Sequence, residues 1–392
     1  METFLQLVAR DLYAKIGNDL SRTAIVFPNK RASLFFNEYL AAETDRPLWS
    51  PAYVSISELF RQLSPLKSGD PIRLVCELYK VFREETRSEE TLDDFYFWGE
   101  LLISDFDDVD KNLVDADKLF SNLQELKNIM DNYDFLDQEQ EEAIRQFFQN
   151  FSIEKRTELK AKFISLWDLT ELGIAYEGMM YRNVMEQLDT DRLRYDRYVF
   201  VGFNVLNRVE TRFFQLLQDA GKAMFYWDYD VFYTRLPLEQ KPPYTHEAGE
   251  FILRNLKLFP NQLPETSFDV LRKPKNVRFI SASTENAQAR YLPQWIRGNE
   301  ELRTPSSFKD TAVVLCNESL LLPVLHSIPA EVKNVNITMG FPLAQTPVYS
   351  FINALVELQT TGYHAGTGRY IYETVITLLK HPYTRQLSPN AE

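Results

Sequence analysis

Apolar positions along the chain alternate between short continuous runs, which indicate buried strands, and three-to-four-residue spacing, which indicates amphipathic helices. This spacing predicts a first helix over Phe4–Ile16 and a second over 32–40, where apolar residues fall at i, i+3, i+4, i+7 and i+8. Between them, the run Ala24–Phe27 predicts a buried strand. The stretch Tyr53–Phe60 predicts a short strand that runs into a helix.

The pattern changes from about Pro71 to Thr190, where glycine is nearly absent, charges are frequent and helical spacing repeats. This stretch predicts an all-helical insertion. Strand character returns at Arg197–Asn204, and a helix follows that ends before Gly221, which we expect at the C′ position. The run from Ala223 predicts the next strand. Strand–helix units that flank a helical insertion indicate a parallel sheet and an α/β fold.

The last third of the chain repeats this style after a Pro-rich connection. Its apolar runs predict strands from Val277 and over Thr311–Asn317, and a short strand with a turn within 334–347. Its periodic stretches predict helices over 285–296, 318–328 and 348–361. We therefore expect a first, discontinuous α/β domain over 1–70 and 191–270, a helical insertion over 71–190, and the start of a second α/β domain over 271–392. Because the sequence stops after a helix with no closing strand, we also expect it to be part of a longer protein.

The turn after the first strand consists of Pro28, Asn29, Lys30 and Arg31, where many nucleotide-binding proteins have glycines. Asn29 is a candidate N-cap of the following helix. Backbone amides at a helix N-terminus, with Lys30 and Arg31 beside them, suit an anion, and a nucleic-acid phosphate bound without chemistry is the functional interpretation. The alternative is that the two cations are exposed and pair with nearby carboxylates.

Ligands of parallel sheets gather at the carboxyl ends of the strands, which here are Pro28–Arg31, Gly202–Asn207 and Asp228–Asp230. An ATPase would need a phosphate loop and metal-binding carboxylates at such ends. The pattern G-x-x-x-x-G-K-[ST] occurs nowhere in the sequence, and the Gly221–Lys222 pair ends a predicted helix. The sequence has a suitable sheet but lacks the groups that would bind and cleave ATP.

Five segments, in this order, resemble a known family: "FLQLVARDL", "AIVFPNKRASLFFNEYL", "RYDRYVFVGFNVLNRVETRFFQLLQDAG", "VRFISASTENAQARYLPQWI", and "TAVVLCNESLLLPVLHSIP" with the "VNITMGFPLAQTPVYSFINALVELQ" that follows it. Together they are similar to the N-terminal, helicase-like half of the B subunit of AddAB-type helicase–nucleases. The resemblance spans nearly the whole chain.

The resemblance implies a P-loop-NTPase-like, superfamily 1 helicase-like fold whose motor is inactive. It implies a PD-(D/E)XK nuclease domain beyond Glu392, which would need Mg²⁺, and an ATP-dependent helicase subunit (AddA-like) as partner in processing DNA double-strand breaks. In this comparison "FPNKRA" occupies the motif that contacts the single-strand backbone, and "VGFN" replaces the Walker B carboxylates. The strand that carries the first phosphate loop is missing. We therefore expect no catalytic residue and no cofactor in this chain.

The candidate DNA-binding residues lie at predicted strand ends and helix starts: Asn29, Lys30, Arg31, Asn204, Ser283 and Thr284. Other roles remain open for their neighbours. "SAST" at Ser281–Thr284 suits a helix cap, a phosphate site or both. Asn207, like Asn204, suits a neutral hydrogen bond to a strand lying across the sheet edge, and the alternative for Asn207 is a helix cap. The aromatic residues Trp227, Tyr229 and Tyr233 suit either base stacking or the core.

Composition narrows these interpretations. The formal net charge is −13 and the pI about 5.0, whereas nonspecific nucleic-acid binders usually have a basic surface. Any DNA contact must therefore lie in a local groove whose potential opposes that of the whole molecule. Two remote cysteines, Cys76 and Cys316, suit two buried thiols in a reducing cytoplasm and cannot form a disulfide framework or a zinc site. The sequence shows no signal peptide and no run long enough to span a membrane.

Other candidate motifs, for a nuclease, a calcium site and a histidine metal site, do not match the required residues and spacing. The "ELK" triplets at Glu125–Lys127 and Glu158–Lys160 fall in charged helical stretches, whereas the nuclease motif needs a strand and a preceding Asp. The acidic run Ser104–Asp117 lacks the EF-hand glycine and is interpreted as a solvated helix face. The four histidines show no ligand spacing. The hypotheses are thus a DNA-guiding scaffold, a protein-interaction module without DNA contact, and a divergent nucleotide binder of the NTPase fold.

Overall fold

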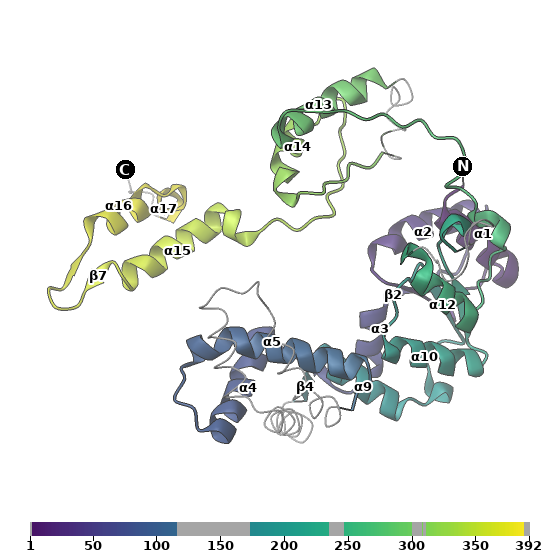
Figure 1. Cartoon of the computed structure of the whole chain (residues 1–392), viewed down its shortest axis with the longest axis horizontal. Coiled ribbons are helices and arrows are strands. Elements are labelled where there is room, and N and C mark those ends of the chain that lie inside the picture. Colours follow the sequence, from purple (N-terminus) through teal and green to yellow (C-terminus); the bar gives the residue numbers. More distant parts are fainter. Residues whose placement is uncertain (1, 116–172, 235–246, 300–307, 309–310, 388–392) are drawn as a thin grey trace, which may run out of the picture. The chain divides into compact units, whose positions relative to one another are not determined.

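Contacts divide the chain into two units, Met1–Pro274 and Lys275–Glu392 (Figure 1). The computed structural model describes residues 2–115, 173–234, 247–299, 308 and 311–387. Each unit is treated separately below. The expected division into 1–70 with 191–270, 71–190 and 271–392 stays a prediction.

The first unit is built on a four-stranded parallel sheet with the order β2-β1-β5-β6. The strands are β1 (Thr23–Phe27), β2 (Ala52–Ser55), β5 (Arg197–Val201) and β6 (Ala223–Tyr226). In register, Val26 of β1 lies between Val54 of β2 and Phe200 of β5, and Phe200 pairs with Phe225 of β6. The parallel sheet and the α/β class are confirmed.

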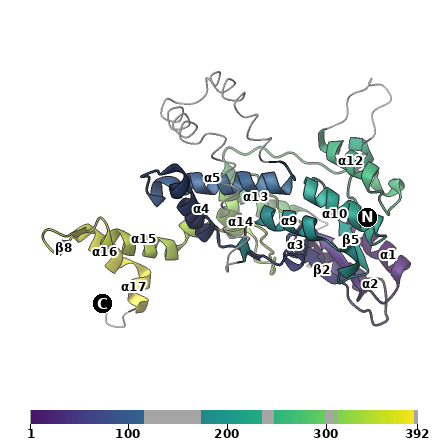
Figure 2. The ribbon, with the colours of Figure 1, turned by 90° about the horizontal axis from the view of Figure 1, so that it is seen from below.

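Helices cover both faces of this sheet, since alternate strand residues point to opposite sides. Ile25 and Val201 share a buried cluster with α1 (Phe4–Ile16) and α2 (Arg31–Ala42). On the other face, residues such as Val26 pack against four helices: α3 (Ile56–Leu63), α9 (Glu177–Gln187), α10 (Arg208–Asp219) and α12 (Glu250–Leu258). In Figure 2 the strands run between α1 and α2 on one side and α9 and α10 on the other.

Local capping explains where several of these helices begin and end. Thr3 caps α1, Ser55 caps α3 and Asn207 caps α10, each in a reciprocal capping box. Gly221 follows α10 with a φ of 68°, the left-handed conformation that terminates helices. The predictions of the helix over Phe4–Ile16, of capping by Asn207 and of Gly221 at C′ are therefore confirmed.

The segment that follows β2 and α3 leaves the sheet as a helical excursion. Its described helices are α4 (Pro71–Thr86) and α5 (Leu92–Lys111), which pack with the start of α9 around a separate apolar cluster that includes Phe82, Phe95 and Phe106. A short parallel pair, β3 (Lys67–Ser68) with β4 (Ile174–Ala175), joins the points where the chain leaves and returns. In its described part the expected all-helical insertion is helical except for the two-residue strand β4.

The remaining elements of the first unit are short. They are α11 (Val231–Thr234) and the 3₁₀ turns Thr190–Arg192, Glu247–Gly249 and Glu265–Phe268.

The second unit contains helices and one small hairpin in its described part. They are α13 (Glu285–Gly298), α14 (Leu321–Ser327), α15 (Pro347–Gln359), α16 (Tyr372–Lys380), α17 (Pro382–Leu387), β7 (Tyr363–His364) and β8 (Arg369–Tyr370), with 3₁₀ turns at Glu318–Leu320 and Leu343–Gln345. The pairs α13–α14 and α15–α16 pack together (Figure 1). The three predicted helices of this region are confirmed.

The three strands expected in the second unit are wrong for the described residues. The segments from Val277, over 311–317 and over 334–347 form no strand, and Phe279 and Val314 are 93% and 84% exposed. Apolar alternation gives a segment the propensity to extend, but a strand also needs a neighbour that accepts its backbone hydrogen bonds. Cys316 lies in one of these segments and is exposed, and Cys76 is only partly buried, so the expectation of two buried thiols is wrong.

Candidate functional site

The loops after β1 and β5 meet at the point where the connections of the sheet reverse direction. The loop 28–30 leads from β1 to α2 on one face, and the loop 202–207 leads from the adjacent β5 to α10 on the other. In parallel α/β sheets, ligands bind outside the strand ends at this position. Asn29, Lys30, Arg31 and Asn204, predicted from separate parts of the sequence, therefore share one edge of one sheet.

The turn after β1 is held by its own side chains. Asn29 Oδ1 accepts a hydrogen bond from the amide of Arg31 at 3.1 Å, and Ser33 Oγ donates to the carbonyl of Lys30 at 2.6 Å. The helix begins at Arg31, so the N-cap position is Lys30 and not Asn29 as expected. Asn29 is not the N-cap because its side chain closes a turn with the amide of Arg31, one position before the N-cap.

Lys30 forms an ion pair inside the protein. Its ammonium contacts the carboxylate of Glu58 in the first turn of α3, while its side chain remains 71% exposed. This hydrogen bond, with help from the Ser55 amide, lowers the pKa of Glu58 below its usual value despite some burial. For Lys30, the alternative of an exposed cation paired with a carboxylate is therefore confirmed, and part of its charge is neutralised.

The other three candidate positions differ in their surroundings. The carbonyl of Asn204 accepts from Asn255 Nδ2 at 2.6 Å, and its side chain is exposed. Thr284 caps α13 by accepting from the amide of Ala287 at 3.1 Å, and Ser283 before it is exposed. Ser283 and Thr284 belong to the second unit, whereas the first four candidate residues belong to the first unit.

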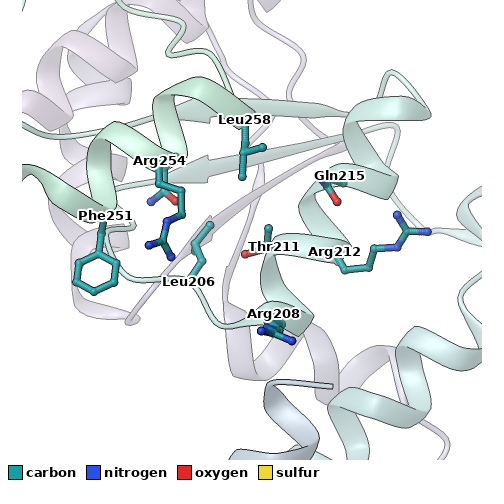
Figure 3. Close-up of a pocket in the computed structure, with 9 residues that line it drawn as sticks. Leu206, Arg208, Thr211, Arg212, Gln215, Phe251, Arg254 and Leu258 are labelled. Carbon is teal, nitrogen blue, oxygen red and sulfur yellow. The ribbon is translucent and has the colours of Figure 1, made fainter. Parts of the chain in front are cut away.

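A groove next to the β5 loop contains functional groups that sequence analysis missed. It has a volume of about 240 Å³ and lies between α10 and α12 (Figure 3). Figure 3 shows Leu206 between the two helices, with Arg254 and Phe251 extending from α12. Its lining also includes Arg208, Thr211, Arg212, Gln215, Asn255 and Leu258. Three arginines thus line one small groove, with the Arg212 side chain extending away from Arg254 (Figure 3), and such a local positive surface is what an acidic protein needs to bind a polyanion.

The sequence contained a weak signal for this groove. Arg208 and Arg212 lie four residues apart at the start of a helix, and Arg208 occupies its first turn, where the helix dipole disfavours a cation. Arg254 lies four residues after Glu250 on α12, which suggests an ordinary helix-surface pair. Nothing local indicates that α12 packs beside α10.

The third strand end has a structural role in the described residues. Asp230 Oδ2 accepts from the amides of Val270 and Leu271, both at 2.8 Å. Trp227 is buried, and its indole nitrogen donates to the carbonyl of Phe259 at 2.8 Å. The core alternative is therefore confirmed for Trp227.

Part of the acidic run is buried, contrary to the expected solvated helix face. Asp110 on α5 is fully buried, accepts a hydrogen bond from the hydroxyl of Tyr176 and pairs with Arg182 Nε at 2.8 Å. Burial and the neighbouring Asp110 carboxylate raise the pKa of Tyr176 well above its ordinary value. The reason for the error is that both partners come from beyond residue 172, on the segment that returns to the sheet.

A serine–histidine pair in the second unit lacks the geometry of a nucleophile. Ser350 Oγ lies 3.0 Å from His381 Nε2. However, His381 Nδ1 accepts from the amide of Tyr383 at 3.2 Å, so the ring proton sits on Nε2. His381 in this tautomer donates to Ser350 and cannot remove its proton.

Metal chemistry also finds no support in the part of the chain that the structure describes. No group of three or more His, Cys, Asp or Glu side chains there is arranged to hold a metal ion. The two "ELK" triplets at Glu125–Lys127 and Glu158–Lys160 lie outside the described residues.

No family model and no curated protein matches the chain. Among the described helices, none has both the length and the apolar composition required to cross a membrane.

Proposed function

We propose that this chain is a catalytically inactive, helicase-like scaffold in the cytoplasm that guides single-stranded DNA and holds an ATP-dependent helicase subunit. The nuclease domain that would use the guided strand, and the Mg²⁺ it would need, lie outside this chain. The fold in this proposal is P-loop-NTPase-like, with a sheet that has lost its phosphate-loop strand.

One observation carries the proposal: the reversal of connections between β1 and β5 gathers Asn29, Arg31 and Asn204 at a single sheet edge. This is the position where α/β sheets bind ligands. The amide of Arg31 is already bound by Asn29 Oδ1, so the cationic side chains of the turn and the neutral amide side chains are the groups that suit phosphate groups of a strand lying across the edge. The same edge has no phosphate-loop sequence and offers Gly202, Phe203 and Asn204 where metal-binding carboxylates would be needed, which favours a scaffold over a motor.

A second candidate, a protein-interaction module, is favoured by the second unit. Large apolar side chains on α15 are exposed, among them Val348, Ile352 and Val356, at helical spacing. Exposed apolar surface of this kind is typical of protein–protein contact sites. The proposed scaffold would use such a surface to hold its helicase partner.

The test is binding of fluorescently labelled oligo(dT) to the full chain, followed by anisotropy over a series of salt concentrations. We expect log K to fall linearly with log salt concentration. Lys30→Ala/Arg31→Ala is expected to reduce the slope by about one, because each lost phosphate contact contributes about 0.7 and Lys30 is partly neutralised by Glu58.

Salt-insensitive binding, or no binding to the oligonucleotide, would favour the interaction module. A clear heat of binding with Mg-ATP in calorimetry would contradict the claim that the chain has no working nucleotide site. If Lys30→Ala/Arg31→Ala binds the oligonucleotide as tightly as wild type does, the turn after β1 does not contact DNA.

A further inference from the structure

The groove between α10 and α12 presents a concentration of positive charge that the rest of the molecule does not predict. The formal net charge of the chain is −13, yet Arg208, Arg212 and Arg254 line one cavity of about 240 Å³ (Figure 3). Guanidinium groups carry planar sets of donors that match phosphate oxygens.

These guanidinium groups have few partners within the protein. Among the described residues, no carboxylate forms an ion pair with Arg208 or Arg212. Arg254 lies 3.8 Å from Glu250, a long contact between two exposed side chains. Because the dipole of α10 disfavours a cation at its start, the stability of the helix does not explain Arg208. A bound anion would explain it.

The groove also offers a ring face and one buried polar side chain. Phe251 is exposed, and the Arg254 guanidinium lies 5.8 Å from its ring centroid. Asn255 is only 4% exposed; its Nδ2 donates to the Asn204 carbonyl, and its Oδ1 accepts nothing from the described residues. Cationic side chains beside an exposed aromatic ring are the combination with which proteins bind single-stranded nucleic acids.

We propose that this groove binds single-stranded DNA, with successive phosphates on the three arginines and a base stacked on Phe251. The proposal rests on the proposed function and adds to it the principal contact site. In Figure 3 Arg212 extends away from Arg254, so the groups suit the spaced charges of a polymer more than one phosphate. A duplex hides its base faces and an acidic peptide has none, so Phe251 favours a single strand.

The first experiment compares the triple variant Arg208→Gln/Arg212→Gln/Arg254→Gln with wild type in the full chain, by the salt-dependent anisotropy of an oligo(dT) of about 16 nucleotides. We expect binding to weaken about tenfold at low salt and the slope of log K against log salt to fall by roughly two, since each phosphate contact on a single strand contributes about 0.7.

The matched control removes three exposed arginines elsewhere in the first unit: Arg73→Gln/Arg83→Gln/Arg192→Gln. It changes net charge equally, so it is expected to bind with nearly the wild-type slope. Arg208→Lys/Arg212→Lys/Arg254→Lys keeps the charge and is expected to retain most of the slope. Circular dichroism verifies that each variant is folded. If a triple variant does not fold, the single variant Arg212→Gln, on the helix surface, is a milder change for the same measurement.

The second experiment isolates the stacked base. Phe251→Ala is expected to weaken binding to oligo(dT) about tenfold and to leave binding to an abasic oligonucleotide unchanged, whereas Phe251→Tyr preserves both.

Three results would overturn the inference. If the groove triple binds like its control while Lys30→Ala/Arg31→Ala weakens binding, the inference fails and the proposed function stands. If wild type shows no salt-dependent binding to oligo(dT), both fail. If poly-glutamate competes as well as oligo(dT) and Phe251→Ala has no effect, the groove binds an acidic protein instead.

Discussion

The buried carboxylate of Asp110 gives a sharp test of how the helical excursion is attached to the sheet. Asp110 on α5 is fully buried and contacts Tyr176, the N-cap of α9, and Arg182 in the middle of that helix. Replacing it by asparagine removes the charge and preserves the size of the side chain. Arg182 then loses its ion-pair partner and Tyr176 a charged acceptor.

The expected cost follows from burial. Breaking a fully buried ion pair by removing one partner costs about 3–5 kcal/mol. Here the side chain of Arg182 is 29% exposed and still donates to the carbonyls of Val109 and Val114, at 3.3 and 2.8 Å. Solvent and these carbonyls offset part of the loss, so we expect Asp110→Asn to lower the free energy of unfolding by about 2–3 kcal/mol.

Urea unfolding followed by far-ultraviolet circular dichroism measures this change. Asp108→Asn is the matched control, since Asp108 lies on the same helix and is exposed, and it is expected to stay within about 0.5 kcal/mol of wild type. The double variant Asp110→Asn/Arg182→Gln should be less unstable than the sum of its single changes, by about 1 kcal/mol or more. Equal effects of Asp110→Asn and Asp108→Asn, or strict additivity, would refute the claim that this pair joins α5 to α9.

Two further substitutions test other contacts by urea unfolding. Gly178→Ala should lower the free energy of unfolding by about 2 kcal/mol, because the new methyl would lie 2.9 and 3.0 Å from backbone atoms of Asp107. Gly69→Ala, whose methyl would face only a flexible side chain, should lower it by less than about 1 kcal/mol. Equal losses for the two variants would contradict this packing. Glu210→Gln should stabilise the protein more at about pH 7 than at about pH 4, because burial raises the pKa of Glu210 and its ionised form is unfavourable in the fold. Glu58→Gln should show the opposite sign, with a loss near pH 7 that shrinks as the pH falls, because a hydrogen bond from the neighbouring lysine lowers the pKa of Glu58. The same pH dependence for both variants would contradict these assignments.

Local patterns were sufficient to predict most of the first unit. The helix Phe4–Ile16 combines an apolar stripe with a capping threonine before it, and both signals are adjacent in sequence. The helix from Arg208 to Asp219 likewise has Asn207 before it and Gly221 after it. The parallel sheet followed because strand–helix units of this kind have few alternative arrangements.

Features that depend on distant partners could not be predicted in the same way. Whether Asp110 is solvated depends on Tyr176, which is 66 residues away. The basic groove depends on α12 packing beside α10, and the sequence of neither helix specifies the other. The apolar run at Val277 has strand propensity, but propensity alone does not supply a hydrogen-bonding neighbour.

The candidate site was predicted in part. Asn29, Lys30, Arg31 and Asn204 were chosen because they follow strands, and the sheet does place those strand ends together. Glu58, whose carboxylate pairs with Lys30, follows the edge strand β2 and was not predicted as part of the site. An edge strand can contribute side chains to a strand-end site as readily as a central strand.

The short pairing of β3 with β4 has a consequence for how this protein can vary in size. Ser68 and Ala175 are neighbours in register, so the chain returns to within one inter-strand spacing, about 4.8 Å, of where it departed. Whatever length separates these two points, the strands β2 and β5 experience the same geometry at the junction. Changes of length that preserve α5 therefore keep the same junction with the sheet, whereas loss of α5 would remove the contacts of Asp110 to α9, which packs on the sheet.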